Sequence, residues 1–416
     1  MRITLSKDFP YQIMFFVAVG ITYFNIYELS LAIWLLLAVV TIKRYYSVPF
    51  LWLVASFVAI FVIAFSRTFF YDHNTYNIIR DIAYFIKPII GLIIGYQCFR
   101  GSDNNFFKVV LYISLILAVI HLCMVGHAVL FKFLKDLMQI RAHAGFFSDF
   151  ETFGLIVVLF HKKFNLNLSK RAYWIYLLII GLSLLFYFAR TNMIQFVMVA
   201  LGMLGLYTIT QKKLTLLAVF GLVSVLGFQW VVSTNPTRNA PGIEGFLYKV
   251  KNAPREIYDP YVVNDNTARF HDNFRSYETQ VTILQMLSRD DLGIWLGNGL
   301  GATVNYGRLM WTTESSRVRH APILHNGYTT VFLKAGIIGL LFFFWSMLFL
   351  FFYGKRSSST YLNNIKLLIN STGLFLFVST LVFLGLYFKM DNKSLFIGGL
   401  LAYYEIQRKL LSDNAI

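Results

Sequence analysis

Long apolar blocks that lack polar faces dominate this sequence and limit what the chain can fold into. Hydrophobic residues make up 57% of its 416 residues and charged residues only 14%, whereas a soluble domain usually carries about 25% charged residues. The amphipathic helices of soluble proteins need a polar face, which these blocks do not have. We therefore interpret the blocks as bilayer spans, and the 42 Phe and 25 Tyr fit lipid-facing surfaces and interfacial belts.

The blocks predict an all-α polytopic membrane protein with about twelve transmembrane helices. The first two blocks together would make one helix well beyond a hydrocarbon core of about 30 Å, so we expect a tight turn near Asn25 to Glu28. The block at 150–162 is short and flanked by charge, and if it does not span, the orientation of every later helix inverts. We expect spans near 11–25, 27–42, 48–65, 81–98, 107–130, 150–162, 172–188, 191–209, 214–232, 327–353, 365–388 and 393–409.

Lys and Arg gather in alternate loops, which indicates how the chain is oriented. With the N-terminus in the cytoplasm, the enriched segments are "IKRYY", "HKKFNLNLSKR", "QKK", "YGKRSSST" and the tail "QRKLL". Both termini are then cytoplasmic, as the positive-inside rule requires. Most of the net charge of +17 therefore comes from loop residues that orient the spans in the membrane. Because nothing in the sequence resembles a nucleic-acid module, we expect no nucleic-acid partner.

Other signals exclude further classes. The first apolar block lacks a small-residue cleavage site and so predicts no cleavable signal peptide. Cys98 and Cys123 lie within or at the ends of predicted spans, and two cysteines build neither a disulfide framework nor a metal cluster. Since no Cys, His or carboxylate cluster has metal-binding spacing, we expect no metal and no cofactor.

One long polar segment divides the chain into three parts. Residues 1–232 are expected to form an N-terminal membrane domain of about nine spans, and 326–416 a C-terminal one of about three. The topology places 233–325 between them as a large extracytoplasmic loop. Its aromatic content and periodic patches predict an ordered loop with helices near 244–252 and 268–288, followed by a glycine-rich turn in "WLGNGLGATVNYG". No strand is expected before "GNGLG", so we interpret it as a close-packing turn and not as a nucleotide fingerprint.

Three side chains on the outer face suggest a reaction site. Arg190 stands at the outer boundary where a span begins, so a phosphate there would meet a guanidinium and the first free amides of the helix. Arg275 in the loop can complete a clamp for a pyrophosphate. His325 can take a proton from an incoming hydroxyl, since an unperturbed histidine pKa of about 6.5 suits general-base work near neutrality.

Each of these residues also has a purely structural alternative. Arg190 can snorkel at a helix end, and Arg275 can pair with Glu278 on a loop helix. His325 can simply precede a helix that Asn326 caps. Three further residues compete with His325 for a role in the site: His320, Arg319 and Arg317.

Lys87 is expected deep in a span. It lies roughly 9 Å into the helix that begins near Asp81, by helical rise. Ionisable residues at such depth usually face a bundle interior or a water-filled path. Two interpretations of Lys87 stay open. Its side chain can snorkel outward to the same phosphate site, or it can simply snorkel to the membrane interface.

The sequence resembles the O-antigen ligase and polymerase superfamily of bacterial membrane glycosyltransferases. The most specific match is "HNGYTTVFLKAGIIG", where His325, Asn326, Gly336 and Gly339 fit the ligase pattern without a gap. "FARTNMI" around Arg190 and "FRSYETQVTILQMLSRDDLGIWLGNGLG" around Arg275 are similar to two further family motifs. A weaker likeness is "RAHAGFFSDFETFG", which contains Arg141. The motifs cover roughly 140–345 and the span layout covers the whole chain.

The resemblance implies a C-type membrane glycosyltransferase that needs no metal. Its donor would be an undecaprenyl-diphosphate-linked glycan, transferred whole to an acceptor hydroxyl at the periplasmic face of the bacterial inner membrane. Arg190 and Arg275, with Lys87 as a further candidate, would hold the diphosphate, and His325 would be the base; Arg141 would be an additional site residue. The implied partners are the donor, an acceptor that is a lipid-linked glycan or the lipid A-core, the bilayer and, as a candidate, a chain-length regulator.

Polymerase, ligase and a protein-directed transferase all fit this resemblance. We expect a repeat-unit polymerase in surface polysaccharide assembly, because the Phe-, Asn- and Lys-rich composition is common among chain polymerases, whereas the histidine motif favours a ligase. A lipid-glycan flippase is the alternative from another class. Transporters commonly show related halves and broken helices near the midplane, and we find no matching halves here.

Overall fold

The computed structural model is an all-helical membrane protein with one small β-hairpin. It describes residues 8–101, 105–145, 148–207, 211–238, 240–259, 272–288, 291–311, 317–381, 383–387 and 390–413. Among these residues, five helices are long and apolar enough to cross a bilayer: α3 (Val48–Thr68), α5 (Phe106–Leu130), α8 (Lys170–Tyr187), α10 (Gln211–Ser233, over Lys213–Ser233) and α16 (Gly327–Phe351).

The other predicted spans also coincide with helices. The predicted turn near Asn25 is confirmed, because Asn25 adopts a left-handed conformation (φ 59°) just before α2 begins. The segment 150–162 forms a helix of only 11 residues, about 16 Å by helical rise and too short to cross alone. These remaining helices are α1 (Phe9–Gly20), continued by the 3-10 turn η1 (Ile21–Phe24), α2 (Tyr27–Val40), α4 (Thr75–Cys98), α7 (Asp149–Leu159), α9 (Arg190–Met203), α17 (Thr360–Ser379) and α18 (Lys393–Asp413).

Ser or Asn side chains start many of these helices. Their oxygens accept hydrogen bonds from backbone N–H groups of the first turn, which would otherwise lack partners. The capped helices and their caps are α3 by Ser47, α4 by Asn74, α5 by Asn105, α7 by Ser148, α8 by Ser169, α16 by Asn326 and α17 by Ser359. Local sequence therefore sets where the helices begin.

Close contact between α4 and α18 forms the centre of the bundle. A Cβ placed on Gly95 would lie 2.1 Å from the Leu395 carbonyl oxygen, and one on Gly398 would lie 2.1 Å from that of Leu92. Small residues let helix backbones approach in this way in membrane proteins. Around this pair, α2 and α3 pack on α4, α16 packs on α3 and α17, α17 packs on α9, and α5 packs on α7 and α8.

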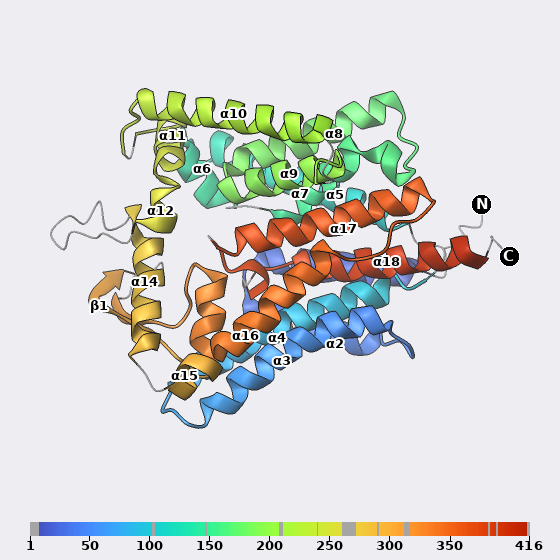
Figure 1. Cartoon of the computed structure of the whole chain (residues 1–416). Coiled ribbons are helices and arrows are strands. Elements are labelled where there is room, and N and C mark those ends of the chain that lie inside the picture. The colour runs from blue at the N-terminus through green and yellow to red at the C-terminus, as the bar shows by residue number, and fades with distance from the viewer. Residues whose placement is uncertain are drawn as a thin grey trace.

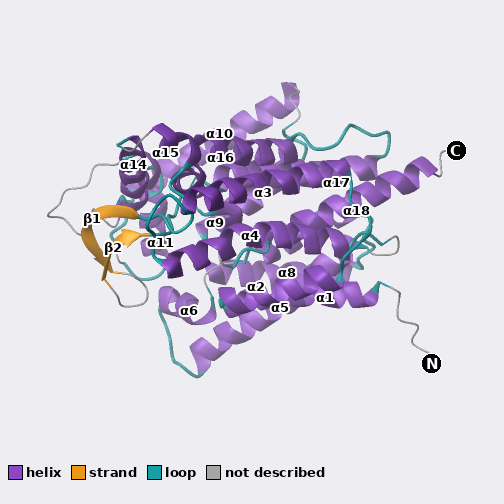
Figure 2. Ribbon diagram, turned by 90° about the horizontal axis from the view of Figure 1, so that it is seen from below, coloured by secondary structure: helices purple, strands orange, loops and turns teal. Residues whose placement is uncertain are grey.

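The segment between α10 and α16 lies across one end of the bundle. It contains α11 (Ile243–Asn252), α12 (Arg255–Tyr258), α14 (Phe274–Leu287), α15 (Asp291–Leu296) and the antiparallel hairpin of β1 (Val304–Trp311) and β2 (Arg317–Ala321). Figure 1 shows α14 standing across the ends of the long helices, and Figure 2 shows the hairpin at that end and both chain termini at the other. We call this segment the end cap.

Both helices predicted for the end cap are present, but the predicted glycine-rich turn was too long. α11 matches the helix expected near 244–252, and α14 falls within 268–288. The glycine-rich turn was extended over Val304 to Gly307, which belong to β1. The hairpin buries Val304 and Tyr306 beneath α14, so tertiary packing stabilises a short strand that glycine content alone disfavours.

Candidate functional site

Two arginines from distant elements hold the same carboxylate. Arg190, the first residue of α9, donates from Nη1 and Nη2 to Glu256 Oε1, both at 3.1 Å, and from Nη2 to Oε2 at 3.2 Å. Arg275 on α14 donates from Nη1 to Glu256 Oε2 at 3.3 Å. All three side chains are partly exposed. The structure thus brings together the two arginines that the sequence suggested as a clamp, with Glu256 of α12 between them.

Further positive charge surrounds this pair. Arg190 also donates from Nη1 to the Lys249 carbonyl oxygen at 2.8 Å, which ties α9 to α11. Burial lowers the pKa of Arg141, and the neighbouring charge of Arg190 lowers it further. The pKa of Lys249 is lowered by burial and then by Arg141 and Arg190, while Glu256 raises it. Four cationic side chains therefore lie near one another at this end of the bundle, and Glu256 acts on three of them, Arg190, Lys249 and Arg275. We call Arg141, Arg190, Lys249, Arg275 and Glu256 the arginine cluster.

The beginning of α9 adds backbone donors to the arginine cluster. Its N-cap residue is Ala189, which offers no side-chain acceptor to the first N–H groups of the helix. Helix N-termini attract anions because these amides and the helix dipole both favour negative charge. The start of α9 thus suits the same type of ligand as the guanidinium groups beside it.

A second carboxylate orients His325. Glu278 Oε2 accepts a hydrogen bond from the His325 backbone N–H at 2.6 Å, and His325 Nδ1 lies 3.3 Å from the same oxygen. Glu278 is 1% exposed, whereas the His325 side chain is 49% exposed. Because a carboxylate can only accept, Nδ1 carries the hydrogen in this contact. The imidazole therefore keeps Nε2 as the nitrogen with a free lone pair.

Helix α14 positions both halves of the site. Arg275 and Glu278 lie three residues apart on it, on neighbouring positions of one helix face. The ring of Phe274 packs edge-on against His325, with centroids 5.5 Å apart. Tyr306 of β1 donates to Glu278 Oε1 at 2.5 Å, and burial beside Glu278 raises the pKa of Tyr306. The ion pair considered between Arg275 and Glu278 is replaced by two separate contacts, Arg275 with Glu256 and Glu278 with His325.

The rival residues near His325 lie elsewhere. Asn326 caps α16, because its side-chain oxygen accepts from the N–H groups of Tyr328 and Thr329 at 2.9 and 3.3 Å. His320 and Arg319 are both exposed on β2, and Arg319 Nε donates to Asn305 Oδ1 at 3.2 Å. The side chain of Arg317 lies outside the part of the chain that the structure describes. The described contacts of Asn326 belong to the start of α16, and those of Arg319 and His320 belong to the hairpin.

The glycine-rich turn packs against α16, as the sequence suggested. Gly297 (φ 79°) lies so close to α16 that a Cβ on it would sit 2.3 Å from the Lys334 carbonyl carbon. Gly336 breaks the helical conformation of α16 (φ 64°), and a Cβ on it would sit 2.4 Å from the Trp295 carbonyl carbon. Beneath this contact, the buried Lys334 pairs with Asp81 of α4. These contacts explain why glycine follows His325 at this spacing, since they set the end cap against the bundle.

The structure buries Lys87 inside the bundle, so neither of the two kinds of snorkelling suggested from the sequence is seen. Its side chain is 1% exposed, with Nζ 4.9 Å from the ring centroid of Trp34 on α2. Asp391 and Lys393 are its nearest described charges. Lys393 in turn pairs with Asp149 at 2.7 Å and with Asp391 at 3.2 Å. Lys87 therefore faces the bundle interior, as intramembrane charges usually do.

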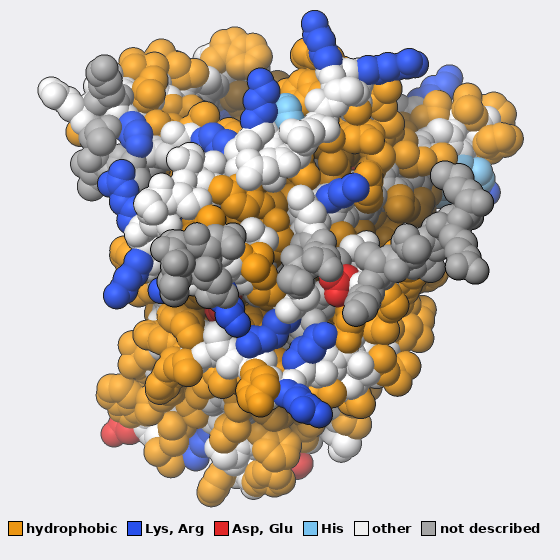
Figure 3. All heavy atoms as spheres, turned by 90° about the vertical axis from the view of Figure 1, so that its right-hand side faces the viewer, with side chains coloured by type: hydrophobic (Ala, Val, Ile, Leu, Met, Phe, Trp, Pro, Cys, Tyr) orange, Lys and Arg blue, Asp and Glu red, His pale blue; other side chains and the backbone are white. Residues whose placement is uncertain are grey.

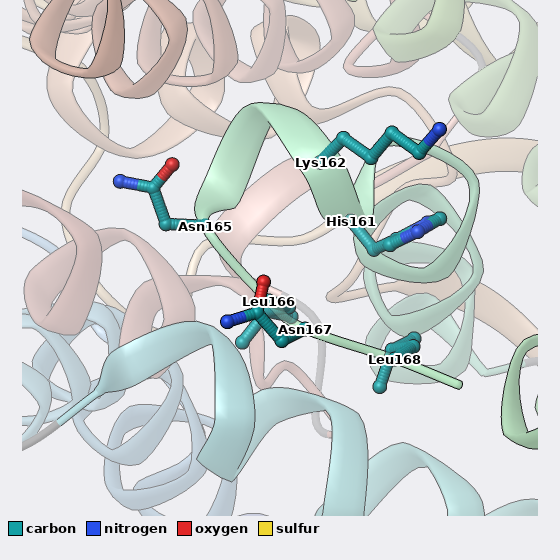
Figure 4. Close-up of a pocket in the computed structure, with 6 residues that line it drawn as sticks. All are labelled: His161, Lys162, Asn165, Leu166, Asn167 and Leu168. Carbon is teal, nitrogen blue, oxygen red and sulfur yellow. The ribbon is translucent and has the colours of Figure 1, made fainter.

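Two surface hollows among the described residues lie at the opposite end of the molecule. Figure 4 shows a cavity of about 450 Å³ in the connection between α7 and α8, lined by His161, Lys162, Asn165, Leu166, Asn167 and Leu168. The labelled side chains point in different directions and do not converge on one position. This connection carries the basic "HKKFNLNLSKR" segment. We do not assign the reaction site to it.

Sequence reasoning missed the two acidic members of the site. Glu256 lies in "NAPREIY", which carries no recognisable motif, and Glu278 was considered only as a partner of Arg275. The sequence did offer one signal, which is that acidic residues are scarce: the chain has 20 of them against 37 Lys and Arg. An acidic residue among so many cations is a candidate for a charge contact. Among the described residues, no group of three or more His, Cys, Asp or Glu is placed to hold a metal ion.

A scan of the chain against protein-family models finds no match, and no curated protein matches its sequence. The site geometry must therefore carry the functional conclusion.

Proposed function

We propose that this protein is a membrane glycosyltransferase that moves an undecaprenyl-diphosphate-linked glycan to an acceptor hydroxyl. The observation that carries the proposal is that Arg190 and Arg275 both donate hydrogen bonds to the carboxylate of Glu256. On the same end cap, Glu278 orients His325. Such an arrangement offers an anion clamp and a proton acceptor at the same end of the bundle. Glycosyl transfer from a lipid diphosphate needs both.

The proposed topology has twelve crossings with both termini in the cytoplasm and the end cap in the periplasm, in the manner of C-type enzymes. The short α7 counts as a crossing together with the 3-10 turn η2 (His161–Phe164) that follows it, because both chain termini lie at the same end of the bundle and an even number of crossings is needed. The face that bears the chain termini carries many Lys and Arg side chains and few acidic ones (Figure 3). The positive-inside rule assigns a face of this kind to the cytoplasm of a bacterial inner membrane. The arginine cluster at the other end then meets the outer leaflet, where a lipid-linked glycan would lie.

The carboxylate of Glu256 marks where an anion sits between the two guanidinium groups. A diphosphate in that place can accept the same hydrogen bonds from Arg190 and Arg275, since planar guanidinium groups bind phosphate and carboxylate oxygens in similar geometry. The uncapped amides of α9 can donate to a second phosphate oxygen. Positive charge held in this way stabilises the diphosphate as it leaves with additional negative charge.

His325 acts as the general base. Its Nε2 accepts the proton of the acceptor hydroxyl while the hydroxyl oxygen bonds to the anomeric carbon. The bond between that carbon and the diphosphate oxygen breaks, and its electron pair leaves with the diphosphate. Attack opposite the leaving group inverts the anomeric centre. Glu278 is a positioning residue, because it keeps the hydrogen on Nδ1 and stabilises the imidazolium that forms.

We assign the reaction to repeat-unit polymerisation of a surface polysaccharide, with a second lipid-linked glycan as the acceptor. One observation favours transfer to the lipid A-core instead. His325, Asn326, Gly336 and Gly339 match the ligase pattern. Asn326 caps α16 directly after His325, and Gly336 breaks α16 where it packs against Trp295 and Gly297. Deletion of the gene distinguishes the two reactions: a single-repeat product on a gel identifies a polymerase, whereas accumulated lipid-linked polymer without core-attached glycan identifies a ligase.

Single alanine substitutions at Arg190, Arg275 and His325 test the enzyme proposal. Each variant is expressed in the deletion strain, and the surface glycan is compared at equal membrane levels of the protein. Arg238→Ala is a matched control, because Arg238 also forms an end-cap ion pair, with Asp272 at 3.1 Å, but lies outside the arginine cluster. His161→Ala at the opposite end controls for loss of a histidine.

We expect the three variants to lose glycan product and both controls to keep it. Normal product from Arg190→Ala and Arg275→Ala would contradict the enzyme proposal and favour a scaffold or a flippase.

A further inference from the structure

Glu256 occupies the place that the proposed function gives to the donor diphosphate. Its two carboxylate oxygens accept from Arg190 at 3.1 and 3.2 Å, and Oε2 also accepts from Arg275 at 3.3 Å. Without an anion, two guanidinium groups this close would repel each other. Burial and the charge of Arg190 both lower the pKa of Arg275, whereas Glu256 raises it. The carboxylate is therefore the counter-ion that keeps the two arginines together.

The two carboxylates of the site differ in how firmly they are held. Glu278 is 1% exposed and accepts from a backbone N–H, an imidazole and a tyrosine hydroxyl. Glu256 is 15% exposed, and in its described hydrogen bonds it accepts from the partly exposed guanidinium groups of Arg190 and Arg275. It also lies on α12, a helix of four residues. Of the two carboxylates, Glu256 is therefore the one that another anion can reach and replace.

We infer that Glu256 is a displaceable counter-ion. The lipid diphosphate displaces its carboxylate from Arg190 and Arg275, and the carboxylate binds the two arginines again when the product leaves. This inference rests on the proposed function. When the site is empty, Glu256 keeps Arg190 and Arg275 in their binding geometry. When a diphosphate arrives, its oxygens replace the carboxylate oxygens.

The charge balance of the reaction explains why such a competitor is useful. The donor diphosphate is esterified at both ends, by lipid and by sugar, and carries two negative charges. Breaking the glycosyl bond frees a terminal phosphate, whose second ionisation has a pKa of about 6, so the product gains most of another negative charge near neutrality. Two arginines would therefore hold the product more tightly than the donor. The returning carboxylate opposes this and favours release.

The test uses purified full-length protein in detergent micelles and farnesyl diphosphate as a short lipid diphosphate. Its dissociation constant is measured for the wild type, Glu256→Gln, Arg190→Ala and Arg275→Ala. Glutamine keeps the size of the side chain but removes its charge. Glu244→Gln is the matched control, because Glu244 is an exposed end-cap carboxylate that accepts from Thr237 and not from an arginine.

We expect Glu256→Gln to bind farnesyl diphosphate about tenfold more tightly than the wild type, because the carboxylate no longer competes for the arginines. A tenfold change corresponds to roughly 1.4 kcal/mol in binding free energy. Glu244→Gln should bind like the wild type, and each arginine variant should bind more weakly. In a transfer assay, undecaprenyl diphosphate should inhibit Glu256→Gln more strongly than the wild type. Glu256→Asp provides a second variant, since its shorter charged side chain should tighten binding to a smaller degree.

The possible failures are distinguishable. If the arginine variants lose binding but Glu256→Gln and Glu256→Asp bind no more tightly than the wild type, the counter-ion inference is wrong and the donor site stands. If the wild type does not bind farnesyl diphosphate, or binds it equally well without Arg190 and Arg275, the proposed donor site itself is wrong.

Discussion

Glu278 holds His325 through the backbone and the ring at once. One carboxylate oxygen, Oε2, accepts from the His325 N–H at 2.6 Å and lies 3.3 Å from Nδ1. The histidine therefore keeps a fixed position although half of its side chain is exposed. A buried carboxylate behind an exposed imidazole is the arrangement expected of a base that must face an incoming substrate.

Glu278→Gln should reduce transfer by about 10- to 100-fold, which is part of the roughly 10²- to 10⁴-fold that a positioned general base contributes. Its effect should fall on turnover, while the affinity for farnesyl diphosphate stays that of the wild type. A second measurement separates positioning from a general loss of structure. The double variant Glu278→Gln with His325→Ala should be no slower than His325→Ala alone, because residues that act as a unit are not additive. Further slowing of the double variant would contradict the proposed pairing.

Replacing Arg190 or Arg275 by lysine should not restore function. Lysine keeps the positive charge but loses the planar fork that contacts two oxygens at once. Since a hydrogen bond to a charged group contributes about 1.5–3 kcal/mol, each Arg→Lys variant should bind farnesyl diphosphate roughly 10- to 100-fold more weakly. Titration of each purified variant checks this, with Arg238→Lys as the control. Wild-type affinity in Arg190→Lys would mean that charge alone suffices there.

Gly336→Ala should destabilise the protein. Gly336 has φ 64°, and an added Cβ would sit 2.4 Å from the Trp295 carbonyl carbon. The left-handed conformation alone costs a residue with a side chain about 1–2 kcal/mol, and the contact with backbone adds to this. Thermal unfolding in detergent should show a clear drop in melting temperature. Gly221→Ala in α10 is the control, because a Cβ there meets nothing within 4 Å, so its melting temperature should stay the same or rise slightly.

Lys334→Met should lower the free energy of unfolding by about 3–5 kcal/mol, the usual effect of leaving a buried charge without its partner. Lys334 and Asp81 are both fully buried, and Asp81 also accepts from the Gly301 N–H at 2.7 Å. The double variant Lys334→Met with Asp81→Asn should recover part of this loss, because the buried carboxylate charge is removed as well. The recovery should stay incomplete, since Arg80 Nη2 also loses its contact with Asp81 at 3.7 Å. Denaturant or thermal unfolding of the wild type and the two variants checks the order. A double variant less stable than Lys334→Met would contradict this explanation.

Helix positions and helix starts follow from local sequence. Each predicted span coincides with a helix because apolar length is a property of contiguous residues. The turn at Asn25 and the cap at Asn326 follow from the preferences of single residues. The hairpin was missed because the burial that stabilises Val304 and Tyr306 comes from α14, which is not adjacent in sequence.

By itself, the sequence determined an all-helical membrane protein with a polar end cap and the residues Arg190, Arg275 and His325 as candidates. Only the tertiary structure decided which acidic group faces each of them, Glu256 between the arginines and Glu278 behind the histidine. It also decided that Lys87 faces the bundle interior. The physical reason is that hydropathy and capping act between neighbours along the chain, whereas charge contacts act between side chains that packing alone brings together.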